Sequence, residues 1–299
     1  MIQSIENQRI KDVYKLYQKK YRVATHSFLI EGEKMLKEAL TNSRLTEQFS
    51  VREIYRSEDF SFTEIDHEYL QDYPQTIVSE RVFSHLSALQ SPRGCIAVIE
   101  RNEWEWTDFD VFQIDQQKPN DGSLVLLLDG IQDPGNVGTI IRIADAVGAK
   151  AVILGDGCAD PYSDKVVRAT MGSLFHVPII TEELMTVIAK LKQAGYRIVA
   201  ADLVGDSYYS NQPSWRTGFV LGSEGRGISQ EIKGQVDTFL TIPMPGDAES
   251  LNVSVAAGIL AFDIRRQWEE KRAQIDLLGN KAGTDSREMD WDSQIDLQK

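Results

Sequence analysis

Three short segments in the second half of the chain place amide, hydroxyl and charged side chains next to apolar runs. The first segment, residues 133–149 (DPGNVGTIIRIADAVGA), follows an apolar run that ends at Asp129. Apolar residues from Ile140 to Val147 recur at helical spacing, which predicts a helix with one buried face. Arg142 lies about 200° around that helix from Ile140. Its guanidinium is therefore expected to point out of the core.

Two expected helix starts carry side chains that could either cap the helix or orient a substrate. Asn136 stands at the start of the first helix. The third segment, residues 242–262 (IPMPGDAESLNVSVAAGILAF), opens with a proline-rich loop and enters a long helix, with Ser250 and Asn252 at its start. Capping alone would explain Asn136 or Ser250. The three hydroxyl or amide side chains within SLNVS also have the density with which a site orients a substrate.

The second segment is a glycine-rich loop, residues 220–229 (VLGSEGRGIS), in which three glycines surround Glu224 and Arg226. Such loops at strand ends let the backbone approach a ligand closely, although they also occur as plain turns. A nucleoside triphosphate-binding loop needs Lys and then Ser or Thr after its last glycine, and Ile228 stands there instead. The dinucleotide-binding fingerprint also fails, because Asp160 takes the place of its third glycine.

From Leu124 onward, buried strands alternate with helical segments. Nearly continuous apolar runs such as LVLLLDG and AVILGD are typical of strands that are covered on both faces. Amphipathic stretches such as TEELMTVIAKLKQAG predict the helices between them, and VVRATMGSLF is interpreted as one helix. The sequence therefore predicts an α/β domain with a parallel sheet over residues 123–270.

The rest of the chain divides into four expected parts. Residues 1–20 form a basic leader, and the first 30 residues hold six basic residues against two acidic ones. Residues 21–100 carry the strand and helix signals of a small α/β domain. The polar stretch 101–122 predicts a linker. The acidic tail, residues 271–299, is expected to be disordered or loosely docked.

Length and composition bound the class of protein. At 299 residues, with 42% hydrophobic and 26% charged residues, the chain has the composition of a globular protein of about two domains. A net charge of -13 means that any nucleic acid would have to bind to a local basic patch. Two cysteines and four scattered histidines predict no metal site. No apolar run approaches the ~18 residues of a membrane span and no signal-peptide core is present, so a cytoplasmic location is expected.

The order and spacing of the three segments resemble the three motifs of the SpoU (TrmH-like) branch of the SPOUT RNA methyltransferases. NVGTIIRIADAVGA, LGSEGRGIS and IPMPGDAESLNVSVAAGI correspond to motifs one, two and three, and the resemblance covers about residues 122–268. The N-terminal stretches HSFLIEGEKMLKEAL and RGCIAVI also resemble a small RNA-binding domain. That domain is related to kink-turn-binding ribosomal proteins and precedes the catalytic domain in ribosomal RNA members of the family.

This resemblance implies S-adenosylmethionine-dependent methylation of a ribose 2'-hydroxyl in RNA, with ribosomal RNA favoured by the extra N-terminal domain. It also implies homodimerisation through the catalytic domain and a deep trefoil knot, which periodicity alone could not reveal. The cofactor pocket would be built by the knotted loops and maps to Leu221, Gly222, Ile242, Met244 and Leu251. The catalytic residues carry over individually to Asn136, Arg142, Glu224, Ser250 and Asn252.

Roles within this implied site follow from ordinary side-chain chemistry. A guanidinium is a poor general base, so Arg142 would grip the adjacent phosphate or stabilise the developing alkoxide. Ser250 and Asn252 would fix the hydroxyl, and Glu224 would orient Arg142 or a group of the third motif. RNA contacts are expected from six basic residues, namely Lys15, Lys19, Lys20, Arg22, Arg168 and Arg226.

Three other functions remain as alternatives to the methylation of ribosomal RNA. The first is 2'-O-methylation of transfer RNA. The second is a protein of the same fold that binds RNA or assists assembly without catalysis, and the third is a nucleotide-dependent oxidoreductase. The intact catalytic positions disfavour the second, and the failed fingerprint at Asp160 disfavours the third.

Overall fold

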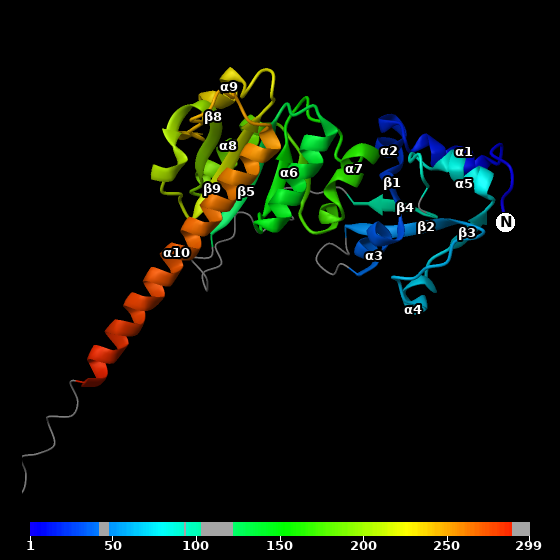
Figure 1. Cartoon of the computed structure of the whole chain (residues 1–299), viewed down its shortest axis with the longest axis horizontal. Coiled ribbons are helices and arrows are strands. Elements are labelled where there is room, and N and C mark those ends of the chain that lie inside the picture. Colours follow the sequence, from blue (N-terminus) through cyan, green and yellow to red (C-terminus); the bar gives the residue numbers. More distant parts are fainter. Residues whose placement is uncertain (42–47, 93, 103–121, 289–299) are drawn as a thin grey trace, which may run out of the picture.

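The chain folds around two β-sheets that lie side by side (Figure 1). The computed structural model describes residues 1–41, 48–92, 94–102 and 122–288, with side chains to residue 277. Most of the predicted linker, residues 103–121, lies outside the described residues.

The N-terminal sheet is mixed and has four strands in the order β1-β4-β2-β3. Strand β4 runs antiparallel to both β1 and β2, whereas β3 is parallel to β2. The strands are β1 (Ser27–Glu31), β2 (Phe49–Ser57), β3 (Gln75–Val78) and β4 (Cys95–Arg101). The helices of this domain are α1 (Gln8–Lys15), α2 (Lys19–Thr25), α3 (Glu33–Thr41), α4 (His67–Leu70) and α5 (Glu80–Leu86).

Helix α1 belongs to this N-terminal domain, so the prediction of a separate basic leader over residues 1–20 is wrong. Ile10 and Val13 of α1, together with Leu16, are buried in the same apolar cluster as Tyr55 of β2 and Phe83 of α5. Ile10 and Val13 lie three residues apart, so they fall on the same side of α1 and give the helix an apolar face. The basic residues of α1 lie on the remaining surface of a packed helix.

The second sheet has six strands, all paired in parallel, in the order β10-β8-β9-β5-β6-β7. Its strands are β5 (Ser123–Asp129), β6 (Ala151–Leu154), β7 (Ile179–Thr181), β8 (Arg197–Ser207), β9 (Arg216–Gly222) and β10 (Thr238–Thr241). Its helices are α6 (Pro134–Ala146), α7 (Asp164–Thr170), α8 (Leu184–Gln193), α9 (Gln230–Lys233) and α10 (Val253–Glu288), with short 3-10 turns at Ser173–Phe175 and Tyr208–Ser210. The predicted α/β class with a parallel sheet is confirmed.

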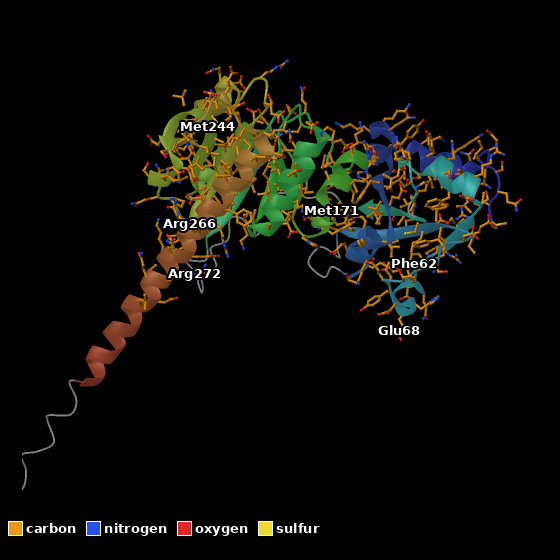
Figure 2. The ribbon with its side chains drawn as sticks, viewed as in Figure 1. Phe62, Glu68, Met171, Met244, Arg266 and Arg272 are labelled. Carbon is orange, nitrogen blue, oxygen red and sulfur yellow. The ribbon has the colours of Figure 1, made fainter. Side chains whose placement is uncertain are left out.

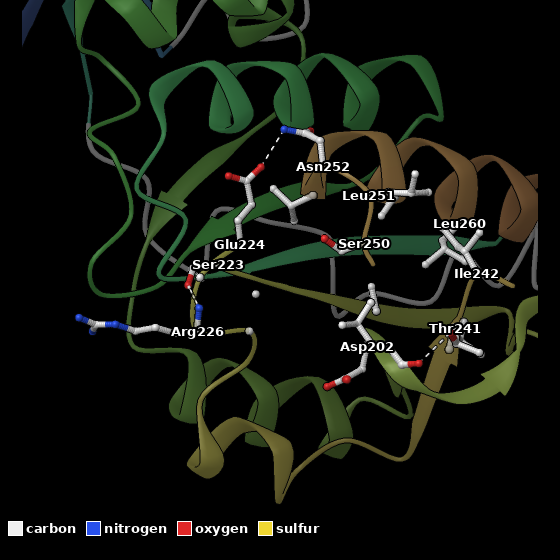
Figure 3. A pocket seen from close by; sticks show the side chains of 18 of the residues that line it. Asp202, Ser223, Glu224, Arg226, Thr241, Ile242, Ser250, Leu251, Asn252 and Leu260 are labelled. Carbon is white, nitrogen blue, oxygen red and sulfur yellow. Dashed lines mark hydrogen bonds between the residues drawn. The ribbon is translucent and has the colours of Figure 1, made fainter. Parts of the chain in front are cut away.

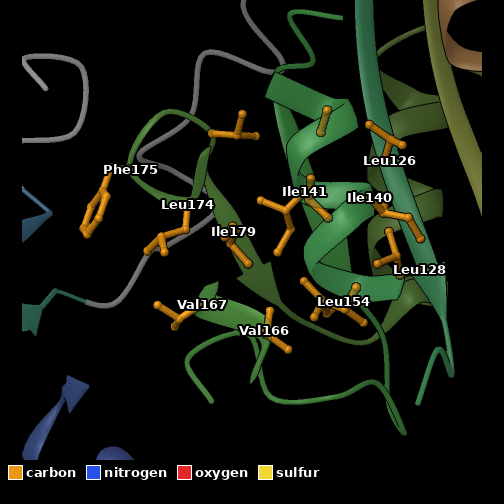
Figure 4. Close-up of a cluster of buried hydrophobic side chains, with 14 of the residues drawn as sticks. Leu126, Leu128, Ile140, Ile141, Leu154, Val166, Val167, Leu174, Phe175 and Ile179 are labelled. Atoms are coloured by element: carbon orange, nitrogen blue, oxygen red, sulfur yellow. The ribbon is translucent and has the colours of Figure 1, made fainter. Parts of the chain in front are cut away.

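The parallel sheet is buried on both faces, as the apolar runs predicted. Leu126 and Leu128 of β5 join a core with Ile140 and Ile141 of α6 (Figure 4). The alternate residues of β5 join a second cluster beneath α8. Because side chains alternate across a strand, a strand between two helix layers must be apolar along its buried length, and residues 124–128 of β5 are.

Two expectations about helices are wrong. The segment VVRATMGSLF is not one helix, because Met171 adopts a left-handed conformation (φ 54°) and α7 ends at Thr170. At the C-terminus, α10 continues to Glu288, so residues 271–288 are helical rather than disordered. Figure 1 shows this last part of α10 projecting away from the parallel sheet. The rest of the tail, residues 289–299, lies outside the described residues.

One continuous apolar core crosses the junction between the two sheets. Phe28 of β1 contacts Tyr162, with ring centroids 5.1 Å apart, and Phe49 of β2 contacts Phe175 at 5.3 Å. Strand β1 contacts α7 at this junction (Figure 1). Removing the N-terminal domain would therefore expose Tyr162 and Phe175 to water. Experiments on RNA binding are better made on the full chain.

A buried ion pair fastens the same junction. Nη2 of Arg22 donates to Oδ2 of Asp160 at 2.6 Å, and Nη1 donates to the carbonyl oxygen of Leu16 at 2.8 Å. The side chains of Arg22 and Asp160 are only 7% and 15% exposed. The prediction that Arg22 contacts RNA is therefore wrong, because its guanidinium is committed to the domain junction.

Arg22→Ala is expected to lower the free energy of unfolding by about 3 kcal/mol, because it leaves Asp160 as an unpaired and mostly buried carboxylate. Urea unfolding of the full chain measures this loss. Arg52→Ala is the matched control, because its pair with Glu100 is exposed on both sides and should contribute less than about 1 kcal/mol. Equal losses in the two variants would contradict the account of the junction.

Candidate active site

Three polar side chains from three different segments meet at the carboxyl edge of the parallel sheet. Oε1 of Glu224, in the loop after β9, accepts hydrogen bonds from Nδ2 of Asn136 at 2.8 Å and from Nδ2 of Asn252 at 2.7 Å. Nδ2 of Asn252 also donates to Oδ1 of Asn136 at 2.9 Å. Figure 3 shows Glu224 and Asn252 facing one another across the loop and the start of α10. The three sequence segments therefore converge on one hydrogen-bonded cluster.

Other side-chain atoms cap the two helices that carry this cluster. Oδ1 of Asp133 accepts from the backbone N–H of Asn136 at 2.9 Å and caps α6. Oδ1 of Asn252 accepts from the backbone N–H of Ser254 at 2.9 Å, at the start of α10. Asp133 therefore caps α6, and Asn252 caps α10 through Oδ1 while its Nδ2 belongs to the cluster. Capping explains neither Asn136 nor Ser250. The buried amide of Asn136 is committed to Glu224 and Asn252.

A cavity of about 600 Å³ opens beside the cluster. Its size is that of pockets that bind nucleoside-like ligands. Side chains from β8, β10 and α10 and the loop after β9 line it (Figure 3). The apolar part of the lining includes Leu240, Ile242, Met244, Leu251, Val253 and Leu260, and the polar part includes Asp202, Glu224, Arg226, Lys233, Thr241, Ser250 and Asn252.

The loop after β9 folds back on itself and forms one wall of this cavity. The backbone N–H of Gly227 donates to the carbonyl oxygen of Ser223 at 2.8 Å, and the N–H of Ser223 donates back to Gly227 at 3.2 Å. A Cβ on Gly222 would lie 2.4 Å from the carbonyl carbon of Gly227. Only glycine therefore lets the loop close at Gly222.

Asp202 is a polar residue of the cavity that the sequence reasoning missed. Its Oδ2 pairs with Nζ of Lys233 at 2.8 Å. Burial alone would raise the pKa of Asp202, but hydrogen bonds from Lys233 and from the backbone N–H groups of Val204 and Leu203 lower it overall. A signal was present in the sequence, because Asp202 directly follows an apolar run, residues 198–201. The pairing of β8 with β9 ends at Ala200, and ligands bind where parallel strands end their pairing at the carboxyl side.

Most of the predicted cofactor-binding residues line the cavity, and one does not. Gly222, Ile242, Met244 and Leu251 are part of the lining. Leu221 is fully buried in the apolar core and is not among the residues that line the cavity. Leu221 is therefore no wall of this cavity.

Four of the five predicted catalytic residues lie at the site, whereas Arg142 does not. Ser250 and Asn252 line the cavity, and Asn136 and Glu224 complete the cluster. Arg142 is exposed on α6, as its helical position predicted, and is not among the residues that line the cavity.

The predicted RNA-binding cations differ in whether carboxylates neutralise them. Lys15 pairs with Asp12 at 2.8 Å, and Arg168 pairs with Asp164 at 2.9 Å. Two other cations of α1 are also paired, Arg9 with Glu53 and Lys11 with Glu6. Lys19 and Lys20 of α2 are exposed, and in the described part of the chain neither has a carboxylate partner. Arg226 is exposed where its loop lines the cavity.

Two further kinds of site find no support in the described residues. Among those residues, no group of three or more His, Cys, Asp or Glu side chains could hold a metal ion. Burial raises the pKa of the Cys95 thiol to about 12, which keeps it protonated and unreactive near neutral pH.

The helices of the described residues include none with the length and apolar character that a membrane span requires.

Comparisons with known proteins match both halves of the chain. A model of the SpoU rRNA methylase family matches residues 123–262, and a model of the MRM3-like substrate-binding domain matches residues 7–97. The chain is 36% identical over 265 residues to a Bacillus subtilis protein, the 23S rRNA (guanosine(2553)-2'-O)-methyltransferase RlmP. That alignment covers 88% of this chain and 98% of the relative.

Solved structures agree with this assignment. An S-adenosylmethionine-bound rRNA methyltransferase from Sinorhizobium meliloti superposes with a TM-score of 0.75 at 30% identity, covering 89% of this chain and 97% of the other. The SpoU methyltransferase AviRb from Streptomyces viridochromogenes, solved with the same cofactor, gives a TM-score of 0.76 at 26% identity, covering 88% and 98%.

The fold and the site define an RNA 2'-O-methyltransferase that uses S-adenosylmethionine. The chain belongs to the SpoU rRNA methylase family.

The residues of the cavity fit S-adenosylmethionine. Apolar side chains such as Ile242 and Leu251 can cover its flat adenine ring, and the closed loop at Gly222 brings backbone groups to the cavity wall. The carboxylate of Asp202 can accept hydrogen bonds from ribose hydroxyls. Asp202 and Glu224 also suit the positive charge of a sulfonium and an ammonium group.

Proposed function

We propose that this protein methylates the 2'-hydroxyl of a nucleotide in large-subunit ribosomal RNA. The observation that carries the proposal is the cluster of Glu224, Asn136 and Asn252 beside a cofactor-sized cavity, in a chain that also has a substrate-binding domain. The relative from B. subtilis, which modifies 23S rRNA by its name, aligns over 98% of its own length. A ribosomal RNA substrate is consistent with a cytoplasmic protein.

Each residue of the site has a role that its contacts support. When bound, S-adenosylmethionine supplies an activated methyl group, so the chain's own task is to position the acceptor oxygen. Oε1 of Glu224 is occupied by two amide donors, and these hold the carboxylate at the edge of the cavity. No described residue donates to its Oε2, which can accept a hydrogen bond from the acceptor hydroxyl. The hydroxyl of Ser250 lies in the same lining and can orient that group further.

We also propose that the protein is a homodimer whose partner face lies on α6 and α10. Val255 and Phe262 on α10 are 50% and 52% exposed and seven residues apart, so they lie on one side of the helix. Helix α6, which carries the exposed Arg142, packs directly against α10. A second copy on this face would cover the apolar side chains and bring its own Arg142 toward the neighbouring site.

The deep trefoil knot implied by the family resemblance stays a prediction. Both glycine-rich and proline-rich loops that would form it contribute to the wall of the cofactor cavity, through Gly222 and Ile242 respectively.

We expect Lys19 and Lys20 to contact RNA phosphates, because they are exposed cations of the N-terminal domain without a carboxylate partner among the described residues. The double variant Lys19→Glu and Lys20→Glu should weaken binding to ribosomal RNA and reduce the slope of log affinity against log salt by about 2. Filter binding at several salt concentrations measures both quantities. The matched control is Lys11→Glu with Lys15→Glu, which removes cations that carboxylates already neutralise. An equal effect of both pairs would contradict this assignment.

Mapping of 2'-O-methylation across total RNA, in cells with and without the gene, tests the proposed substrate. We expect one ribose in large-subunit ribosomal RNA to lose its methyl group when the gene is absent. Loss of a methyl group from transfer RNA would instead support the alternative substrate. An unchanged methylation map would contradict the proposal.

A further inference from the structure

A second cavity, of about 480 Å³, lies on the other side of the loop after β9. Residues 223–227 of that loop line both cavities and so form a shared wall. The floor of the second cavity comes from the loops after β5 and β6, residues 129–133 and 156–157. Gly130 (φ 64°) and Gly157 (φ 80°) face one another there, and a Cβ on Gly157 would lie 3.7 Å from Cα of Gly130.

The position of this cavity matches what an acceptor nucleotide needs. Methyl transfer requires the acceptor oxygen and the donor to be held in line, on opposite sides of the migrating methyl group. Glu224 and Asn136, two members of the hydrogen-bonded cluster, line the second cavity, and Glu224 also lines the first. The shared wall therefore places the acceptor-orienting cluster between a cofactor cavity and a second cavity with room for a nucleoside.

The lining of the second cavity is rich in hydrogen-bond acceptors. It contains four carboxylates, from Asp129, Asp133, Asp156 and Glu224, and one cation, from Arg226. Such a lining disfavours a phosphate inside the cavity and favours a neutral base that presents N–H groups. The exposed guanidinium of Arg226, at the shared wall, is the group that could hold the adjoining phosphate outside.

Three of the four carboxylates accept hydrogen bonds from described residues, and Asp156 is the fourth. Oδ2 of Asp129 accepts from the backbone N–H of Ser229 at 2.7 Å, and Oδ1 of Asp133 caps α6. Oε1 of Glu224 accepts from two amides. For Asp156, the structure records no donor among the described residues. Its carboxylate can therefore accept two hydrogen bonds from one ligand.

Two parallel acceptors distinguish guanine from the other bases. Guanine presents two adjacent donors on its pairing edge, the ring N1–H and the amino group at C2. Uracil offers one N–H between two carbonyl groups, whereas adenine and cytosine place an amino donor beside an acceptor nitrogen. On either of these edges, one carboxylate oxygen would face an acceptor atom of the base instead of an N–H donor.

We propose that this second cavity binds the base of the target nucleotide and that Asp156 selects guanine. The proposal rests on the proposed methylation of RNA and adds the identity of the nucleotide. The ribose would then lie toward Glu224 and Asn136, and the phosphate toward Arg226.

The test uses the full-length protein, S-adenosylmethionine and a ribosomal RNA fragment that carries the nucleotide found by mapping. Two further fragments replace the target nucleotide by inosine, which lacks the amino group at C2, and by adenosine. We expect wild-type kcat/KM to fall at least about tenfold with inosine and further with adenosine, because a hydrogen bond to a charged group is lost. Asp156→Asn should lower kcat/KM with guanosine about tenfold or more and reduce the guanosine-to-inosine ratio to below about threefold.

Binding of S-adenosylmethionine to Asp156→Asn should equal that of the wild type and shows that the variant is folded. Glu231→Gln is the matched control, because this exposed carboxylate on α9 lines neither cavity. Methylation of a uridine, cytidine or adenosine would overturn the guanine proposal and leave the proposed methyltransferase function standing. An unchanged preference in Asp156→Asn would overturn the role of Asp156. If no RNA were methylated at all, the proposed function and this inference would both fall.

Discussion

Arg142→Ala is expected to lower the rate of methyl transfer at least about 100-fold while leaving the affinity for S-adenosylmethionine unchanged. We propose that its guanidinium stabilises the developing alkoxide. It does not line the cofactor cavity, so cofactor binding should survive its loss. Single-turnover methylation and calorimetric binding measure the two effects separately.

The matched control for this variant is Arg197→Ala. Arg197 begins β8, at the amino edge of the sheet and opposite the site, and its Nη2 donates to Thr238 at 2.6 Å. This variant should keep its turnover within about twofold of the wild type, since a surface contact of this kind contributes little. If Arg142→Ala were equally active, the assignment of Arg142 would be wrong.

The position of Arg142 on the exposed side of α6 has a consequence for a mixed dimer. If Arg142 acts on the neighbouring subunit, co-expression of Arg142→Ala with a variant of weakened cofactor binding should restore activity at a cofactor concentration that fills only sites with normal affinity. Each mixed dimer would hold one intact site, so about a quarter of wild-type activity is expected from random pairing. No restoration would mean that Arg142 acts within its own subunit or that the dimer does not form.

Gly222→Ala supplies the cofactor-deficient partner and is the second large effect we expect. Its Cβ would lie 2.4 Å from the carbonyl carbon of Gly227, so the loop that lines the cavity would have to open. Such overpacking commonly costs about 1–3 kcal/mol, which corresponds to a weakening of S-adenosylmethionine binding by about 5- to 150-fold. Calorimetry with the purified variant measures this change.

Gly246→Ala is the control for the glycine substitution. A Cβ on Gly246 meets no atom within 4 Å, so binding of S-adenosylmethionine should stay within about twofold of the wild type. Equal affinity in Gly222→Ala would show that the loop tolerates the methyl group and that the cavity is not shaped by glycine at this position.

The elements of the catalytic domain were predictable because local patterns determine them. The run LVLLL, residues 124–128, is apolar throughout, and this part of β5 is buried on both faces. The helical spacing around Ile140 correctly placed Arg142 on the exposed side of α6. The break at Met171 was not predictable from this periodicity, because the two residues of positive φ there, Met171 and Gly172, leave the apolar pattern almost unchanged.

The contacts within the site depend on tertiary structure and could not be derived from spacing alone. Asn136 and Asn252 are 116 residues apart in the chain and lie 2.9 Å apart through their amide groups. Only the family resemblance brought them together in advance. Basic residues that are close in sequence likewise differ in burial, because Arg22 is buried against Asp160 whereas Lys20 is exposed. Which cation stays available to RNA depends on the carboxylates that folding places beside it.

The most direct test of the central claim is transfer of a labelled methyl group by the purified protein. Ribosomal RNA from cells that lack the gene would be incubated with S-adenosylmethionine labelled in its methyl group and then hydrolysed with alkali. A 2'-O-methyl group blocks cleavage of the adjoining phosphodiester, so the account predicts that the label appears in alkali-resistant dinucleotides from large-subunit RNA. Label in single nucleotides, which would carry a methyl group on the base, or no incorporation at all, would contradict it.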